Sequence, residues 1–420
     1  MTGEPTTRGG AHAAADHAAR ESYSRLVGFL AAASGDLALA EDALATAFER
    51  ALSTWPVNGT PENPAAWLLS VARNHQRDVW KSAAHRKSTE LDDRADAVGE
   101  VSVTPFDELD PDAIGDKRLE LLFTCAHPAI DPAIRTPLML QAVLGFEAAD
   151  VAAAFAVAPA TMAQRLVRAK RRIRDARIPF VVPDRAAMPA RLSAVLEAVY
   201  GCFAIAWNET NGSGTGAVDS MAGEALYLAV TLADLLDDEP EAWGLAALIA
   251  FSLSRAPART GPFVPLEEQD TDRWNRDLIR EGEAMLNRAA SLDAPMGRFQ
   301  LEAAMQSVHT DRARTGVVAW DALRSLTTAL VAVTPTLGAR VAHAAIVGHA
   351  GSPAEGLALL DQLESEHDLD DFQPFHATRA DLLFRNGATA AARHHYERAA
   401  TLTRDPHVRE WLHHRAGGGY

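Results

Sequence analysis

The chain has 420 residues, a formal net charge of −16, 48% hydrophobic and only 6% aromatic residues, and two cysteines. This length predicts more than one domain, and an alanine-rich, aromatic-poor composition favours closely packed helices over a sheet. The sequence contains no run of about 18 apolar residues, so no membrane span is expected. The first dozen residues lack the apolar core of a secretory signal. Cys125 and Cys202 lie far apart without metal-type spacing, so we expect a reduced, cytoplasmic protein with buried thiols.

The charge is unevenly distributed along the chain. Residues 117–177 hold ten Lys and Arg against five Asp and Glu, whereas residues 88–116 hold ten Asp and Glu against one Arg. A basic segment in an otherwise acidic chain is the pattern expected of a site that binds a polyanion. The negative net charge therefore does not exclude nucleic acid as a partner.

The first part of the chain is predicted to be helical after a disordered start at residues 1–15. One apolar stripe begins at Tyr23, and a second consists of Leu39, Ala43, Ala47, Phe48 and Leu52. Trp55-Pro56 is expected to end this second helix, and a loop follows. Another helix is expected from Pro64 towards Trp80. Residues 89–115 are acidic with scattered Pro and Gly, which predicts a flexible linker.

The most strongly patterned stretch is residues 160–177. Met162, Leu166, Ala169 and Ile173 form one apolar stripe, and a short small-residue helix over 148–155 precedes it. Two helices joined by a tight turn indicate a helix-turn-helix, whose first turn would contact base edges and whose basic turns would contact phosphates. The alternative is an amphipathic bundle helix with a merely solvated face. The candidate DNA-contacting residues are Thr161, Gln164, Arg165, Arg168, Lys170, Arg171 and Arg172.

Residues 181–420 show helical periodicity throughout and no alternating strand pattern. The expected helices are Leu192–Trp207, Ala225–Leu236, Trp243–Leu253, Leu278–Ala290, Leu301–Val308, Trp320–Val333, Leu357–Leu363 and Ala377–Leu402. Near the end, a Gly-led turn at Gly387 repeats one at Gly351, 36 residues earlier. This spacing is close to the tetratricopeptide period of about 34 residues. Such repeats stack into a solenoid whose concave face binds a peptide or another domain.

Seven polar residues of this half are of types that occur in active sites, so an enzyme has to be considered. Polar side chains beside apolar helical stripes more often form hydrogen bonds between helices. The sequence contains no phosphate-binding Gly loop, no HExxH pair and no nucleophile elbow. We therefore expect no enzyme, no cofactor and no metal site. The seven residues are Glu209, Asp270, Asp272, Arg273, His309, His376 and Asp381.

Four strings in the first 180 residues together resemble a bacterial extracytoplasmic-function (ECF) RNA polymerase sigma factor. DLALAEDALATAFERAL and PAAWLLSVARNHQRDVW look like its region two, and RLELLFTCAHPAI and VAPATMAQRLVRAKRRIRDARIPF look like its region four. The resemblance implies an all-α protein with sigma domains at residues 16–88 and 116–180, the second a helix-turn-helix, joined by the acidic linker 89–115. A helical-repeat, tetratricopeptide-like extension would then occupy residues 181–420.

The resemblance also implies partners and contact residues. The partners are core RNA polymerase, through its β′ clamp and β flap, and promoter DNA, with no membrane. The helix-turn-helix residues named above would read the upstream promoter element. The clamp-binding residues would be Asp36, Glu41, Asp42 and Phe48. Melted, flipped bases of the downstream element would meet Asn74, Gln76, Arg77, Trp80 and Lys81.

Two departures from the family pattern stand out. The common Gln-Glu pair is replaced by Ala45-Thr46, and Cys-Cys-His by Cys125-Ala126-His127, which we interpret as local packing. For Trp67 and Trp80, core packing is the alternative to a DNA contact.

Strings such as AWNE, LEEQD, FQLEAA and HATRADLL resemble the extension of one sigma-factor group, which carries a tetratricopeptide-like domain in place of an anti-sigma protein. The resemblance implies a sigma factor regulated by its own C-terminal domain. Two alternatives stay open. One is a DNA-binding regulator with a tetratricopeptide sensor that does not join the polymerase. The other is a small-molecule enzyme or binding protein.

Overall fold

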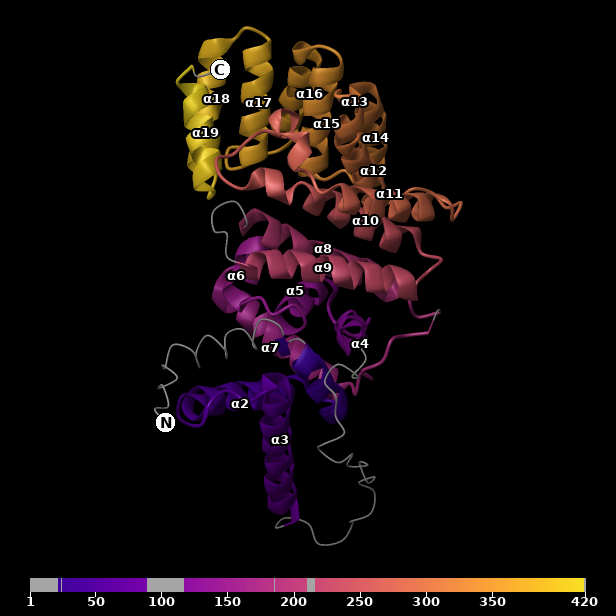
Figure 1. Cartoon of the computed structure of the whole chain (residues 1–420), viewed down its shortest axis with the longest axis vertical. Helices are drawn as coiled ribbons and strands as arrows, with labels where there is room; N and C mark the ends of the chain where they lie inside the picture. The colour runs from indigo at the N-terminus through magenta and orange to yellow at the C-terminus, as the bar shows by residue number, and fades with distance from the viewer. Residues whose placement is uncertain (1–21, 24, 89–116, 185, 210–215, 419–420) are drawn as a thin grey trace, which may run out of the picture. The chain divides into compact units, whose positions relative to one another are not determined.

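The computed structural model describes residues 22–23, 25–88, 117–184, 186–209 and 216–418. Every regular element in these ranges is a helix (Figure 1), so the predicted all-α class is confirmed. The predicted disordered start at 1–15 and the acidic linker at 89–115 lie outside the described residues. The chain forms two compact units, Met1–Ala198 and Val199–Tyr420.

The first unit begins with a helical pair. A helical stretch over residues 25–34 leads into α2 (Leu37–Asn58), which packs against α3 (Pro64–Ser88). Asp36 begins α2 because its carboxylate accepts hydrogen bonds from the backbone N–H groups of Ala38 and Leu39. Trp55 is fully buried against Trp67, with ring centroids 5.5 Å apart. Trp67 is half-buried and packs edge-on against the core ring of Trp55, whereas Trp80 is 43% exposed.

The rest of the first unit is a cluster of shorter helices. They are α4 (Lys117–Cys125), α5 (Pro132–Ala142), α6 (Ala148–Ala154), α7 (Pro159–Asp175) and the start of α8 (Pro189–Glu209). Arg191 at the start of α8 is buried and donates to the Phe123 carbonyl at the end of α4, at 3.3 Å. Cys125 is fully buried, which raises the pKa of its thiol. The side chain of His127 accepts a hydrogen bond from the Ala129 N–H, so this segment is local packing as predicted.

The second unit is built around α10 (Pro240–Ser254), which contacts α9 (Gly216–Leu235), α11 (Arg276–Ala290) and α12 (Arg298–Thr310). Most side chains of α10 are buried on every side, as expected for a central core helix. The backbones of α10 and α12 lie so close together that residue 244 must be a glycine: a Cβ on Gly244 would lie 2.7 Å from the backbone nitrogen of Gln300. The connection from α10 to α11 carries three 3₁₀ turns, η2 (Ala256–Arg259), η3 (Leu266–Glu268) and η4 (Thr271–Arg273).

Helical hairpins complete the second unit. After α13 (Arg312–Thr315) and α14 (Trp320–Val333), successive helices pack as neighbours. They are α15 (Leu337–Ala350), α16 (Pro353–Glu366), α17 (Gln373–Arg385), α18 (Thr389–Leu402) and α19 (Pro406–Ala416). The starts of α17 and α18 follow those of α15 and α16 by 36 residues, the spacing seen in the sequence. The turn predicted at Gly387 divides the helical stretch Ala377–Leu402, because Gly387 adopts φ 82° and separates α17 from α18.

One described stretch, Pro189–Trp207 of α8, is long and apolar enough to cross a membrane by length and composition. The sequence criterion missed it because Arg191 and Glu197 interrupt the apolar run. Half of this stretch is buried inside the fold, and a buried core helix has the same length and composition.

Candidate nucleic-acid interface

The candidate site centres on α7. Pro159 occupies the first turn, where its missing N–H removes no helical hydrogen bond. Arg172 and Arg174 lie in the last turn, where their charge complements the negative end of the helix dipole. The predicted apolar stripe is buried against α5 and α6 and consists of Met162, Leu166, Ala169 and Ile173.

The opposite face of α7 is exposed and basic. A four-residue connection from α6 orients this face, and within it Ala156 adopts a left-handed conformation at φ 51°. Six of the seven predicted DNA-contacting side chains lie on the exposed face. They are Thr161, Gln164, Arg165, Arg168, Arg171 and Arg172.

A cleft lies between this face and the start of α5. Arg165, Arg168 and Arg172 line one side, and Ile130 and Ile134 contribute apolar surface. The Arg172 Nε donates to the Ala129 carbonyl at 3.3 Å, which fixes the guanidinium at the edge of the cleft. Three guanidinium groups beside an apolar floor suit an anionic ligand that also offers some apolar surface, and a nucleic acid has both.

Lys170 is placed differently from its neighbours, which corrects the expectation that it faces DNA. Its Nζ lies 2.6 Å from Oε2 and 2.8 Å from Oε1 of Glu41 on α2. The side chains of Lys170 and Glu41 are only 9% and 17% exposed. The Nη1 atom of Arg174 adds a weaker contact at 3.8 Å to the Asp36 carboxylate. Reasoning from the sequence missed this pair, because no local pattern joins residues 129 positions apart.

The predicted clamp residues of α2 therefore have distinct environments. Asp42 is exposed, and Asp36 serves as the helix N-cap. Phe48 is half-buried and stacks with Tyr23 at 6.5 Å between ring centroids. Burial, with Lys170 acting in the opposite direction, raises the pKa of the Glu41 carboxyl above its ordinary value. Burial and the nearby acidic groups raise the pKa of Tyr23 to about 12.

On α3 the residues predicted to meet melted DNA form one exposed face, with one exception. Asn74, Arg77, Trp80 and Lys81 are exposed. Gln76 is 3% exposed, and its Nε2 donates to the Leu30 carbonyl at 3.4 Å. It falls on the buried stripe with Leu69 and Ala72, so its expected contact with bases is corrected to a packing role.

The seven polar residues that could have formed an active site do not assemble into one cluster. His349 Nε2 lies 3.1 Å from Asp381 Oδ2, and His376 pairs with His395. Arg273 donates to Thr260 at 2.7 Å, and the Asp270 carboxylate accepts from the Asp272 N–H. His309 stacks edge-on against Trp320. The Glu209 side chain lies outside the described residues. No group of three or more potential metal ligands gathers within the described part of the chain.

Comparison with known proteins gives three kinds of similarity. Residues 191–290 match a family of unknown function, DUF6596. Two "Probable ECF RNA polymerase sigma factor SigI" sequences, from two strains of Mycobacterium tuberculosis, are 32% identical over 145 residues. That match covers 34% of this chain and 49% of each relative, so it spans about half of their length.

A tetratricopeptide repeat protein from Parabacteroides merdae has a TM-score of 0.33 and 13% identity, covering 72% of this chain and 99% of that structure. The "Uncharacterized protein R00370" of Rhizobium meliloti (strain 1021) is 34% identical over 377 residues, covering 87% of this chain and 86% of that protein. Because this similarity extends over nearly the full length of both sequences, the chain belongs to the same family as the Rhizobium meliloti protein.

Proposed function

We propose that the chain is a sigma factor that binds core RNA polymerase and directs promoter-specific transcription initiation. The observation that carries this proposal is the exposed basic face of α7 opposite its buried stripe, with Thr161 and Gln164 towards the helix start. A helix whose first turns carry hydrogen-bonding side chains and whose later turns carry arginines suits base-edge and phosphate contacts, respectively. The partial similarity to the SigI proteins supports the same function.

The second contact with promoter DNA is proposed on α3. Asn74, Arg77 and Lys81 present donors on one exposed face, and Trp80 offers an exposed ring on which a flipped base can stack. In this proposal α2 contacts the β′ clamp through Glu41, Asp42 and Phe48, and the helices α4 to α7 contact the β flap.

The C-terminal unit is proposed to regulate the sigma activity through a peptide or protein bound on its helical hairpins. No catalytic chemistry is proposed for the chain, since the polymerase supplies it. The proposed compartment is the cytoplasm, where the polymerase works.

A DNA-binding regulator that never joins the polymerase is the second candidate. The exposed face of α7 would serve it equally well, but α3 would then have no need of an exposed tryptophan among donors. Association with core polymerase separates the two candidates.

The test is reconstitution with purified full-length chain and core RNA polymerase that lacks any other specificity subunit. Gel filtration measures co-elution, and run-off transcription on a pool of promoter-length genomic fragments measures initiation. We expect a stable complex and discrete transcripts that depend on the chain. DNA binding without co-elution would favour the regulator, and absence of both would refute the proposal.

A further inference from the structure

The contact between α2 and α7 joins two elements that serve different partners in the proposed function (Figure 1). α2 carries the residues proposed for the polymerase clamp, and α7 carries those proposed for DNA. The contact is held by the two short bonds from Lys170 Nζ to the Glu41 carboxylate, at 2.6 and 2.8 Å. The pair between Arg174 and Asp36 lies beside it.

Because Glu41 and Lys170 are largely buried, the contact between α2 and α7 depends on both side chains. Both side chains are mostly removed from water, and two further acidic groups of α2, Asp36 and Asp42, also act on Glu41. A buried ion pair contributes modestly while it is intact. Removing one partner, however, leaves an uncompensated charge and strongly disfavours the buried arrangement. Since α2 and α7 lie in different sequence segments, an open arrangement would return both charges to water.

We propose that Glu41 and Lys170 form an autoinhibitory latch that holds α2 against α7 in the free chain and that core RNA polymerase must open. This inference rests on the proposed function. The Glu41 carboxylate has its oxygens committed to Lys170 and is 17% exposed, so it cannot contact the clamp while the latch is closed. Binding of polymerase to α2 and closure of the latch are then competing events, and the free energy of closure lowers the apparent affinity.

The test uses the full-length chain and three variants. Lys170→Glu places two carboxylates together and opens the latch, and the double variant Lys170→Glu with Glu41→Lys restores an ion pair in the reversed orientation. Arg177→Glu is the matched control, because it makes the same change of charge on an exposed side chain two residues beyond the end of α7. Lys170→Met removes the charge but keeps the apolar stem, in case the reversal perturbs folding.

Electron–electron double resonance reports the latch without any polymerase. Spin labels on cysteines introduced at Ser53 of α2 and Gln164 of α7 are specific, since both positions are exposed and both native cysteines are buried. We expect one narrow distance distribution in the unsubstituted chain, in Arg177→Glu and in the double variant. Lys170→Glu and Lys170→Met are expected to give broader and longer distributions.

The affinity of each variant for core polymerase, measured without DNA, reports whether opening the latch favours polymerase binding. Lys170→Glu and Lys170→Met are expected to bind about tenfold more tightly than the unsubstituted chain, in the range of coupling between contacting charges. Arg177→Glu is expected to bind unchanged. Unchanged distances in both Lys170 variants would overturn the latch, as would opened distances without a gain in affinity. If no form of the chain binds polymerase, the proposed function fails and the latch fails with it, whatever the distances show.

Discussion

The carboxylate of Glu241 fills the space that a side chain at Gly297 would occupy. A Cβ built on Gly297 would overlap the Glu241 carboxyl carbon. The two carboxylate oxygens accept hydrogen bonds from the N–H groups of Phe299 and Gln300, at 2.9 and 3.0 Å. A side chain of α10 thus provides the N-terminal cap that α12 lacks in its own sequence, because its N-cap residue is a glycine.

Gly297→Ala is therefore expected to destabilise the C-terminal unit. The methyl group would displace the Glu241 carboxylate and leave two backbone donors of α12 without their acceptor. We expect a loss of about 1–3 kcal/mol in the free energy of unfolding, the range for an unsatisfied buried donor. Chemical denaturation followed by circular dichroism measures it.

Gly338→Ala is the matched control for this substitution. Gly338 lies in α15 with no atom within 4 Å of a Cβ built on it. Because alanine favours a helix over glycine, this change is expected to be neutral or to stabilise by up to about 1 kcal/mol. Equal effects of the two substitutions would show that the Glu241 cap contributes nothing.

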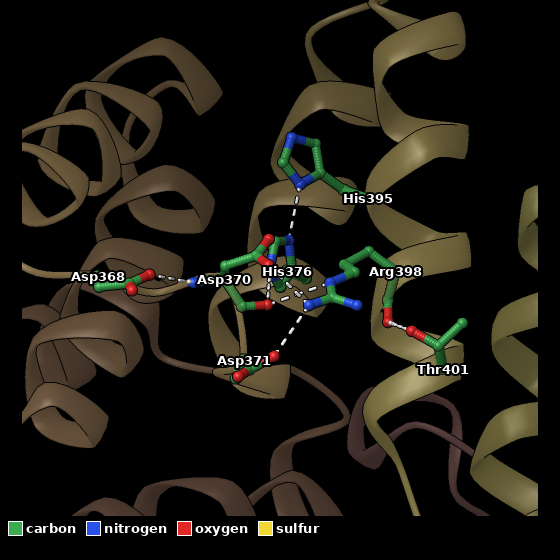
Figure 2. A network of polar contacts seen from close by, with 7 residues as sticks. All are labelled: Asp368, Asp370, Asp371, His376, His395, Arg398 and Thr401. Atoms are coloured by element: carbon green, nitrogen blue, oxygen red, sulfur yellow. Dashed lines mark hydrogen bonds and ion pairs between the residues drawn. The ribbon is translucent and has the colours of Figure 1, made fainter.

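A second relationship links His376 and His395, whose Nδ1 atoms lie 3.0 Å apart (Figure 2). His376 Nε2 also lies 3.0 Å from the Asp370 carbonyl, which can only accept, so Nε2 carries the hydrogen. The Nδ1 of a neutral His376 is then the acceptor and His395 Nδ1 the donor. Arg398 bonds the Asp370 and Asp371 carboxylates and holds the loop that supplies this carbonyl.

Acidification is expected to weaken the C-terminal unit through His395. Burial, followed by the positive field of Arg379 and the two histidines His376 and His394, lowers the pKa of His395 from 6.5 to about 4. The unfolded chain therefore binds a proton before the folded chain does. The stability from the neutral ring is complete above about pH 6.5 and falls as the pH drops towards 4. Thermal unfolding at pH 7.5 and pH 5 measures this loss.

His395→Asn isolates the contribution of this side chain. The asparagine amide keeps a donor near His376 Nδ1 but takes up no proton, so the drop in Tm between the two pH values should shrink by a few degrees Celsius. Part of the drop should persist, because burial also lowers the pKa of His309 to about 4. His414→Asn, which changes an exposed histidine of α19, serves as the control. A Tm drop that is the same in both variants would contradict the assignment.

How well the sequence predicted the buried face of each helix depended on whether its apolar residues fit only one phase of the helical period. The buried stripe of α7 was predicted correctly, because its apolar positions alternate with arginines that fit only one phase of the helix. The stripe predicted for α2 was correct at Ala43 and Ala47, which are fully buried, but not at Leu52. Leu52 is 40% exposed, whereas Leu37, Leu44 and Trp55 are buried, since the many alanines of α2 fit several phases equally well. Trp55 and Pro56 do not end α2, which continues to Asn58 because a proline near a helix C-terminus removes only one hydrogen bond.

The candidate site was predictable as a helix face but not as a tertiary arrangement. Which residues share the exposed face of α7 follows from the helical period alone. That Lys170 leaves this face for Glu41 depends on the packing of α2 against α7, which no local pattern encodes. In the same way, Gln76 is buried because α3 presents that side to the Leu30 carbonyl.

The turn between α6 and α7 gives a third prediction. Ala156 adopts φ 51°, in the left-handed region that disfavours residues with a Cβ by about 1 kcal/mol. Ala156→Gly removes this strain, so we expect the first unit to gain about 0.5 kcal/mol. Ala153→Gly, on an exposed helical position of α6, should instead lose about 1 kcal/mol. Differential scanning calorimetry measures both, and a loss in each case would argue against strain at Ala156.

The fourth prediction concerns Arg168, which is exposed on α7 and lines the cleft with Arg165 and Arg172. If its guanidinium contacts a DNA phosphate, Arg168→Ala removes one site of counterion release. The slope of log affinity against log salt should then fall by about 1. The chain loaded on core polymerase is titrated with promoter duplex by fluorescence anisotropy between about 50 and 200 mM salt.

Arg50→Ala is the control for this measurement, because it removes the same charge from an exposed position on α2 rather than from the face of α7. Its salt slope should match that of the unsubstituted chain. A base-edge contact gives a different signature, since Arg168→Ala would then weaken binding to one sequence more than to others and leave the slope nearly unchanged. If Arg168→Ala and the unsubstituted chain had equal salt slopes and equal affinities for every duplex, Arg168 would not be a DNA contact. The exposed, basic neighbours of Arg168 would not change this conclusion, because exposure and charge alone do not distinguish a phosphate contact from a solvated arginine.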